Sequence, residues 1–216
     1  MTKYFITIAG NIGVGKSTLV KLLSQKTDWE PVFEAFEENP YLEDFYKDMR
    51  RWSFQSQVFF LSRRLRQHHD LLKSKQSIIQ DRSVYEDAEI FARNLYNQGN
   101  ISERDWVCYY DLYQTLVTLL QPPHLMIYLK ASVPTLRKRI IHRGRDYEQS
   151  IEDAYLEQLN QLYEEWANSF TLSPILTIDT NKLNYVAYED HLALIWQKIQ
   201  ERLQGRDYLA LSATND

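Results

Sequence analysis

The sequence predicts an α/β fold, in which helices cover both faces of a five-stranded parallel sheet. Short apolar segments alternate with longer amphipathic segments along the 216 residues, the pattern of parallel strands joined by helical crossovers. Hydrophobic residues make up 44% of the chain and charged residues 25%, which is the balance of one sizeable core inside a charged surface. No repeat or low-complexity linker interrupts this pattern, so we expect one domain over residues 1–204 and a polar tail at 205–216.

The first part of the chain is predicted to begin with a strand and a helix. Residues 3–9 contain alternating β-branched and aromatic side chains, which predict the strand, and leucines at helical spacing after residue 18 predict the helix. We interpret residues 29–33 as the second strand. Asn39-Pro40 then breaks the chain before a short helix at residues 41–47.

The middle of the chain is predicted to be mainly helical. Apolar residues at helical spacing predict a long helix from residue 52 to about 73, and a short apolar strand follows at residues 77–80. The next helix covers residues 83–97 and ends at a Gln-Gly-Asn turn. A further helix runs from Ser102, where an acid three positions on indicates a capping box, to about residue 120.

The last part returns to an alternation of strands and helices. Residues 124–129 form an apolar strand, and Pro134 lies in the first turn of the helix that follows. Amphipathic spacing predicts a helix over about 151–170, and the last strand and helix are expected at residues 174–178 and 185–203. The sequence therefore provides five strands.

The turn after the first strand has the sequence Gly-x-x-x-x-Gly-Lys-Ser, the pattern of a phosphate-binding loop. Its glycines let successive backbone N–H groups turn toward an anion, and the helix that follows adds its positive N-terminal end. Lys16 would reach the outer phosphates of a nucleoside triphosphate, and the hydroxyl of Ser17 would help to hold Mg²⁺. We expect the triphosphate to contact Gly10, Asn11, Ile12, Gly13, Val14, Gly15, Lys16, Ser17 and Thr18.

Asp81-Arg82-Ser83 comes directly after an apolar strand, at the edge of the sheet where open α/β folds bind ligands. Asp81 could act on Mg²⁺ through water, and Arg82 could hold a phosphate or a catalytic carboxylate. A helix cap at Ser83 with an incidental salt bridge is the simpler alternative, and it would be preferred for an isolated triplet. The position beside a phosphate-binding loop favours the functional interpretation.

Five basic residues lie within nine positions after the fourth strand. Arg139 and Arg143 are four positions apart and share a helical face, and Arg145 follows a glycine. We interpret residues 143–149 as a lid that closes over the triphosphate, and we expect Arg139, Arg143 and Arg145 to bring their guanidinium groups to ATP. The alternative is a solvated basic face, but no run of acids compensates these charges.

Composition argues against several other classes of protein. The net charge of −4 is unlike that of a general nucleic-acid binder, and no apolar run approaches the length of a membrane span. The single cysteine, Cys108, cannot form an intramolecular disulfide, and the first strand begins at the N-terminus with no secretory signal before it. We therefore expect a cytoplasmic protein.

Five segments in this order resemble the deoxynucleoside kinase family, most closely the bacterial branch that phosphorylates deoxyadenosine and deoxyguanosine. They are residues 10–18, Glu34 with Glu37-Glu38-Asn39-Pro40-Tyr41-Leu42, Trp52-Ser53-Phe54-Gln55-Ser56-Gln57, Asp81-Arg82-Ser83-Val84-Tyr85 and Arg143-Gly144-Arg145-Asp146-Tyr147-Glu148. The resemblance implies a three-layer P-loop kinase fold with an Arg-rich lid, ATP and Mg²⁺ as cofactors, and a homodimer. It also implies transfer of the γ-phosphate of ATP to the 5′-hydroxyl of a deoxynucleoside, with a purine favoured.

The resemblance places a general base after the second strand, where it takes the proton of the 5′-hydroxyl. Glu30-Pro31-Val32 matches the family's triplet letter for letter, whereas Glu34-Ala35-Phe36 matches it loosely. Glu34 nevertheless has the family's register relative to the Glu-Asn-Pro-Tyr segment, and it lies at the carboxyl end of the strand. We assign the base to Glu34, with Arg82 beside it to keep it ionised.

The resemblance further implies the substrate-binding residues Glu34, Tyr46, Gln57, Arg64, Arg82, Asp87, Phe91 and Glu148. Gln57 and Arg64 are seven positions apart on one helical face and match base-reading positions, as does Asp87. Arg64 together with Asp87 fits a purine, although an exposed polar helix face is the alternative for Gln57 and Arg64. Tyr46 and Glu148 match the positions that bind the sugar 3′-hydroxyl. The ring of Phe91 either stacks on the base or belongs to the core.

Two other functions remain as alternatives. A kinase for nucleoside monophosphates would need further basic residues for the acceptor phosphate, whereas the helix with Gln57 offers a neutral side chain there. A P-loop switch that reads guanine would need Asn-Lys-x-Asp, but Asn181-Lys182 continues with Leu-Asn. In the preferred interpretation Glu34, Arg82 and Lys16 are catalytic, and Ser17 and Asp81 hold the metal.

Overall fold

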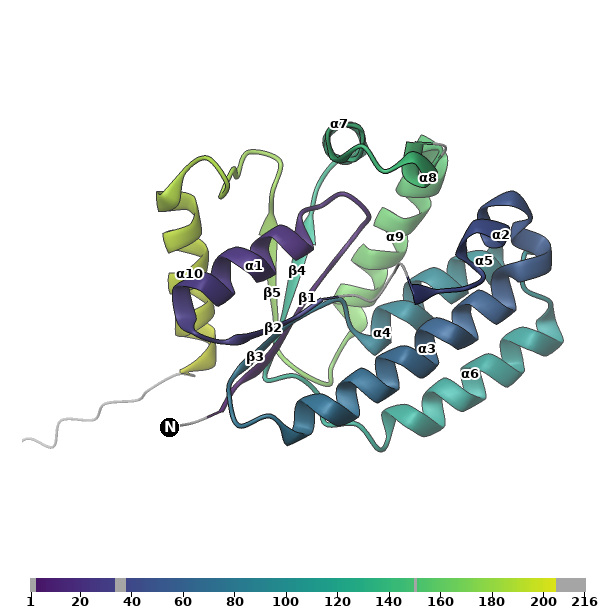
Figure 1. Cartoon of the computed structure of the whole chain (residues 1–216), viewed down its shortest axis with the longest axis horizontal. Coiled ribbons are helices and arrows are strands. Elements are labelled where there is room, and N and C mark those ends of the chain that lie inside the picture. Colours follow the sequence, from purple (N-terminus) through teal and green to yellow (C-terminus); the bar gives the residue numbers. More distant parts are fainter. Residues whose placement is uncertain (1–2, 34–37, 150, 205–216) are drawn as a thin grey trace, which may run out of the picture.

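The computed structural model describes residues 3–33, 38–149 and 151–204. In this part of the chain five strands form one parallel sheet in the order β2-β3-β1-β4-β5 (Figure 1). The strands are β1 (Phe5–Gly10), β2 (Glu30–Val32), β3 (Ile78–Asp81), β4 (Leu125–Lys130) and β5 (Ile175–Asp179). The predicted α/β fold with a five-stranded parallel sheet is confirmed.

β1 lies at the centre of the sheet, between β3 and β4. Ile8 of β1 pairs with Asp81 of β3 on one side and with Ile127 of β4 on the other. β2 and β3 lie on one side of β1, and β4 and β5 lie on the other, so the chain switches from one side of the sheet to the other beside β1. The crevice at the carboxyl ends of strands around such a switch is the usual ligand site of an open parallel sheet.

Helices cover both faces of the sheet (Figure 1). One face carries α1 (Lys16–Thr27) and α10 (Glu189–Leu203), and the other carries α3 (Met49–Lys73), α6 (Glu103–Val117) and α9 (Asp153–Ser169). At the carboxyl edge, at the top of Figure 1, lie α7 (Val133–Arg143) and the short α8 (Asp146–Gln149). None of the helices in the described ranges is both long and apolar enough to span a bilayer.

The sheet separates two hydrophobic cores, and β4 contributes to both. Leu125, Ile127 and Leu129 belong to the core that includes side chains of α1, α7 and α10. Met126 and Tyr128 belong to the core on the side of α3, α6 and α9. All five side chains are buried, because successive residues of a strand point to opposite faces and both faces are covered.

Two helices begin three or four positions from their predicted starts, because polar side chains set their ends. The last helix begins at Glu189 and not at residue 185, since the Asn184 side chain accepts hydrogen bonds from the N–H groups of Val186 and Ala187 and closes a turn there. The long helix begins three residues before the expected start, since the Asp48 carboxylate accepts a hydrogen bond from the Arg51 N–H at 3.0 Å.

The single helix expected over residues 83–97 consists of three consecutive pieces. They are α4 (Val84–Glu86), the π-helical turn η2 (Asp87–Ala92) and α5 (Arg93–Asn97). A π-helical turn contains one more residue than an α-helical turn, so it rotates the side chains before it relative to those after it. η2 packs against α3 and α9, and Asp87 and Phe91 on it face the cavity described next.

Candidate active site

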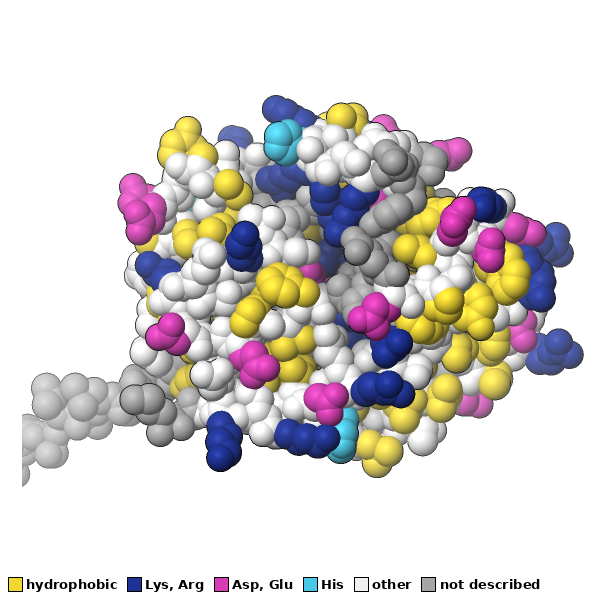
Figure 2. Space-filling model, viewed as in Figure 1, with side chains coloured by type: hydrophobic (Ala, Val, Ile, Leu, Met, Phe, Trp, Pro, Cys, Tyr) yellow, Lys and Arg dark blue, Asp and Glu magenta, His cyan; other side chains and the backbone are white. Residues whose placement is uncertain are grey.

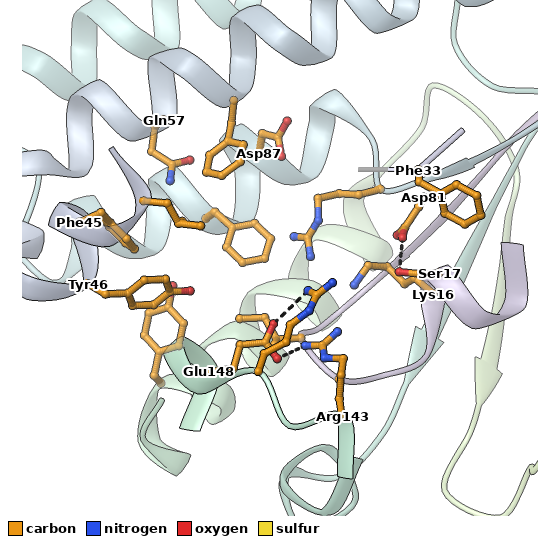
Figure 3. A pocket seen from close by; sticks show the side chains of 18 residues that line it. Lys16, Ser17, Phe33, Phe45, Tyr46, Gln57, Asp81, Asp87, Arg143 and Glu148 are labelled. Atoms are coloured by element: carbon orange, nitrogen blue, oxygen red, sulfur yellow. Dashed lines mark hydrogen bonds and ion pairs between the residues drawn. The ribbon is translucent and has the colours of Figure 1, made fainter. Parts of the chain in front are cut away.

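A cavity of about 230 Å³ opens at the carboxyl edge of the sheet (Figure 3). Lys and Arg side chains gather in the hollow below α7 in the space-filling view (Figure 2). The described residues that line the cavity are Ile12, Gly13, Lys16, Ser17, Phe33, Leu42, Phe45, Tyr46, Gln57, Phe60, Asp81, Arg82, Asp87, Phe91, Arg143, Arg145, Glu148 and Tyr155. Cations are thus concentrated at one end of the cavity, whereas Gln57, Asp87 and the aromatic rings of Phe45 and Tyr46 lie at the other (Figure 3).

The loop between β1 and α1 forms the cationic end. Its last glycine, Gly15, precedes α1 with a φ of 108°, and a Cβ there would lie 2.3 Å from the hydroxyl oxygen of Tyr185. Only glycine fits this position. Lys16 lines the cavity, and its Nζ donates to the carbonyl oxygens of Gly10 at 2.8 Å and Asn11 at 3.1 Å.

Only part of the predicted loop set faces the cavity. Ile12, Gly13, Lys16 and Ser17 line it. The Asn11 side chain instead donates to the carbonyl oxygen of Leu156 and to Asn160 on α9, at 2.9 and 2.8 Å, and Val14 is buried in the core. These side chains anchor the loop, so a ligand would meet the loop backbone at these positions.

Ser17 and Asp81 face each other at the floor of the cavity (Figure 3). The Ser17 hydroxyl donates to Oδ2 of Asp81, while Oδ1 of Asp81 is buried and has no hydrogen-bond partner among the described residues. No cluster of three or more acidic, His or Cys side chains suited to a metal occurs in the described ranges. One hydroxyl and one carboxylate with a spare oxygen fit Mg²⁺, which usually keeps waters and takes further oxygens from phosphates.

Arg82 extends over the cavity from the turn after β3. Its φ of 66° lies in the left-handed region, and its N–H donates to the carbonyl oxygen of Ile8 on β1 at 3.0 Å. The guanidinium carbon lies 4.2 Å from the centre of the Phe91 ring, a cation–π contact. The side chain is therefore held in place from both ends.

The other end of the cavity contains Gln57 of α3 and Asp87 of η2. Gln57 is buried, and its Oε1 has no hydrogen-bond partner among the described residues, so it can accept one from a ligand. Arg64, predicted to read the base directly, is not among the described lining residues. It lies behind Asp87, where Nε donates to Oδ2 of Asp87 at 3.1 Å and Nη1 donates to the carbonyl oxygen of Asp81 at 3.2 Å.

The predicted lid forms the end of α7 and the short helix α8. Gly144 ends α7 with a φ of 70°, and Arg143 and Arg145 on either side of it line the cavity. Both guanidinium groups pair with the buried carboxylate of Glu148, Arg143 through Oε2 and Arg145 through Oε1 at 3.4 Å (Figure 3). Glu148 thus holds two lid arginines beside the cavity.

Arg139, assigned to ATP with the other lid arginines, occupies a different place. It donates to the carbonyl oxygen of Val14 at 2.9 Å, and to the hydroxyl and carbonyl oxygens of Thr180 at 3.0 and 2.7 Å. It is not among the described residues that line the cavity. In this structure Arg139 joins the phosphate-binding loop to the segment after β5.

Glu34, the assigned general base, lies outside the described residues. Phe33, directly before it, lines the cavity. Glu30, the rival candidate, begins β2, and its Oε2 accepts a hydrogen bond from the Ser74 hydroxyl at 2.6 Å. Glu30 is not among the described lining residues, because it lies at the opposite end of β2 from the cavity.

Five described lining residues were not predicted from the sequence, namely Phe33, Leu42, Phe45, Phe60 and Tyr155. Phe33 follows β2, and the other four are apolar or aromatic residues of helices, where helical spacing does not distinguish a cavity wall from a core. Burial raises the pKa of Tyr155 to about 12, so its hydroxyl stays protonated at neutral pH and can donate a hydrogen bond.

Comparison with known proteins identifies the family. The family model described as deoxynucleoside kinase matches residues 6–204. The chain belongs to the deoxynucleoside kinase family. Among relatives of this family, the deoxyadenosine/deoxycytidine kinase of Bacillus subtilis is 37% identical over 175 residues, which cover 80% of this chain and 81% of that protein. The deoxyguanosine kinase of the same organism is 36% identical over 208 residues, covering 93% of this chain and 98% of the relative.

Solved structures of the family have the same fold. The deoxyadenosine kinase from M. mycoides with bound dATP superposes with a TM-score of 0.80 at 34% identity, covering 92% of this chain and all of that one. The same kinase with the products dCMP and dCDP gives a TM-score of 0.81. Relatives and structural neighbours are thus deoxynucleoside kinases, which are ATP-dependent phosphotransferases, and the P-loop kinase fold expected from the sequence is confirmed.

Proposed function

We propose that this chain transfers the γ-phosphate of ATP to the 5′-hydroxyl of a deoxynucleoside, with a preference for purines. The observation that carries the proposal is that the phosphate-binding loop, Arg82, the lid arginines and Gln57 all line the same cavity. A phosphate donor at Lys16 and a nucleoside at Gln57 would meet beside Arg82. Residues 1–204 would form one kinase domain, in a cytoplasmic setting.

The chain's own residues would position the reactants and offset charge. Lys16 and Arg82 on one side of the cavity, and Arg143 and Arg145 on the other, would surround the transferring phosphoryl group and stabilise its negative charge. Glu34 would take the proton of the 5′-hydroxyl. Mg²⁺ held by Ser17 and Asp81 would supply further charge neutralisation at the phosphates.

The nucleoside would lie at the end of the cavity that contains Gln57 and Asp87. Gln57 would hydrogen-bond to the edge of the base, and Phe91 would lie against its face. Asp87 would also contact the base, with Arg64 behind it to fix the carboxylate, so Arg64 would act through Asp87. Tyr46 and Glu148 would bind the 3′-hydroxyl. The relatives named deoxyadenosine/deoxycytidine kinase and deoxyguanosine kinase each include a purine nucleoside in their names, which supports the purine assignment.

A kinase for nucleoside monophosphates is the main rival. It would need a cation for the acceptor phosphate, but the described lining residues contributed by α2 (Leu42–Lys47) and α3 are Leu42, Phe45, Tyr46, Gln57 and Phe60, all uncharged. Steady-state assays with the four deoxynucleosides and with thymidine monophosphate test both proposals. We expect kcat/KM for deoxyadenosine or deoxyguanosine to exceed that for thymidine by about tenfold or more. A preference for thymidine would contradict the purine assignment, and turnover of the monophosphate alone would contradict the nucleoside kinase.

We also propose that the protein is a homodimer. Val107 and Leu112 on α6 are about half exposed, and Leu119 just beyond its end is 75% exposed. A second copy of the chain would cover these aliphatic side chains. Multi-angle light scattering coupled to size-exclusion chromatography should give the mass of two chains. A measured mass of one chain would contradict the proposal.

A further inference from the structure

We propose that Glu86 is a positioning residue for phosphoryl transfer, because its side chain ties the phosphate-binding loop to the turn that carries Arg82. This inference rests on the proposed function. Glu86 ends α4, is fully buried, and is not among the described residues that line the cavity. It would therefore act through the groups that it holds.

The Glu86 carboxylate accepts four hydrogen bonds from three different elements. Oε1 accepts from the N–H of Gly10 at 3.1 Å and from the hydroxyl of Tyr163 at 2.8 Å. Oε2 accepts from the N–H and the hydroxyl of Ser83 at 2.8 and 3.1 Å. Gly10 ends β1, Ser83 follows Arg82, and Tyr163 lies on α9, so one buried side chain fixes three elements relative to one another.

The bond to Gly10 reaches Lys16 through one residue. Gly10 has a φ of 140°, and a Cβ there would lie 2.4 Å from the carbonyl oxygen of Leu129. A residue with a side chain would therefore clash at this position. The N–H of Gly10 is held by Glu86, and its carbonyl oxygen accepts a hydrogen bond from Nζ of Lys16 at 2.8 Å. A displacement of the Glu86 carboxylate would therefore move the Gly10 backbone, whose carbonyl oxygen accepts the hydrogen bond from Lys16.

The bonds to Ser83 hold the backbone that follows Arg82. The N–H of Arg82 is bonded to Ile8, and the next N–H, that of Ser83, is bonded to Glu86. Fixed peptide groups on both sides are what allow a non-glycine residue to keep a left-handed conformation. Glu86 thus helps to aim the Arg82 guanidinium at the cavity.

A carboxylate suits this position better than an amide of the same shape. Two backbone N–H groups, one at each oxygen, are fixed donors, and glutamine would present its own NH₂ group to one of them. Burial raises the pKa of Glu86, and the charges of Arg82 and Lys16 oppose this increase. The two cations and four donors offset part of the cost of burying this carboxylate under a site for phosphates.

The test compares Glu86→Gln with Glu89→Gln, the same chemical change three residues along the chain. Glu89 accepts hydrogen bonds from Arg93 and Tyr110 and is not among the described lining residues. With ATP and deoxyadenosine, we expect E86Q to lower kcat by roughly 10- to 100-fold, the effect of a misplacement of about 1 Å. The KM for deoxyadenosine should change by less than about threefold, since the nucleoside end of the cavity is untouched. E89Q should change kcat by less than about twofold.

Equal kcat values for E86Q and the wild type, or equal losses in E86Q and E89Q, would overturn the proposal. If E86Q does not fold, Tyr163→Phe and Ser83→Ala each remove one hydroxyl donor, and kcat should fall by about two- to fivefold while Tm falls by only about 2–4 °C. Wild-type kcat in both variants would then overturn it.

A second readout separates this inference from the proposed function. ADP binding measured by calorimetry should be about three- to tenfold weaker in E86Q than in the wild type, because the loop backbone would be misplaced. A wild type that phosphorylates no nucleoside would refute the proposed function, and the ADP comparison would still test Glu86. Equal ADP affinities together with equal kcat values would refute the role of Glu86 alone.

Discussion

The backbone of Arg82 has a left-handed conformation that residues other than glycine rarely adopt. A φ of 66° at such a residue costs about 1–3 kcal/mol relative to a relaxed backbone. The N–H bond to Ile8 and the contact with Phe91 offset part of this cost. A strained backbone at Arg82, whose cationic side chain lines the cavity, is consistent with a role of this residue in the reaction.

Glu34 and Glu30 can be distinguished by matched substitutions. Glu34→Gln should lower kcat by about 10²- to 10⁴-fold, because an amide cannot take the proton of the 5′-hydroxyl. Glu30→Gln should change kcat by less than about twofold, since Glu30 bonds to Ser74 away from the cavity. Initial rates with ATP and deoxyadenosine measure both. A large loss in E30Q with an active E34Q would show that the base is assigned to the wrong glutamate.

Arg64 should contribute strongly to stability, because its ion pair with Asp87 is buried. Both side chains are only 4% exposed, and Arg64→Met would leave the Asp87 carboxylate buried without its cation. We expect the free energy of unfolding, measured in urea, to fall by about 3–5 kcal/mol. Arg63→Met is the control: Arg63 pairs with Glu38 at the surface, so the loss should stay below about 1 kcal/mol. Equal losses in the two variants would contradict this account.

At the scale of elements, the chain is anchored on both sides of the proposed lid, residues 143–149. Before it, Ser132 and Thr135 at the start of α7 donate hydrogen bonds to Asn181 after β5. After it, Asp153 at the start of α9 pairs with Arg137 of α7. Motion of the lid would therefore be concentrated between these anchors, around Gly144, where the left-handed backbone ends α7.

The packing of α3 on β1 should make stability depend on pH. His68 of α3 is buried against the ring of Phe5, and its Nε2 has no partner among the described residues. Burial lowers the pKa of His68 below 6.5, so in acid the unfolded chain binds a proton that the folded chain does not. The stabilisation is present above pH 6.5 and is lost as the pH falls toward the folded-state pKa.

Two neighbouring substitutions test this dependence. His68→Leu should flatten the fall in unfolding free energy between about pH 7 and pH 5, measured by urea denaturation, because leucine binds no proton. His69→Leu, at an exposed position, should leave the fall unchanged. An unchanged slope in the His68 variant would show that this residue does not cause it.

At the scale of the whole molecule, the strands and the phosphate-binding loop could be predicted because their signals are local. Apolar alternation marks buried strands, and the spacing of Gly10, Gly15 and Lys16 marks the loop. The starts of α3 and α10 could not be predicted, because each depends on which backbone N–H group donates a hydrogen bond to one side chain, Asp48 for α3 and Asn184 for α10. The π-helical turn has no comparable local signal.

The candidate site was predictable as a set of chain segments but not in its side-chain contacts. Helical spacing placed Arg139 and Arg64 on the correct helices, yet it gave no information on their hydrogen-bond partners. Those partners are Thr180 and Asp87, which are distant in sequence. The role of Glu86 was missed for the same reason, since two of its donors, Gly10 and Tyr163, lie on other elements.

The whole-molecule claim is that the sheet brings a phosphate donor at Lys16 and a nucleoside at Gln57 into one cavity. The most direct test is incubation of the purified protein with γ-labelled ATP, Mg²⁺ and deoxyadenosine or deoxyguanosine, followed by chromatography of the products. We predict that the label moves to the nucleoside as the 5′-monophosphate. Label that stays in ATP or appears only as free phosphate, or that moves only when a nucleoside monophosphate is the acceptor, would contradict it.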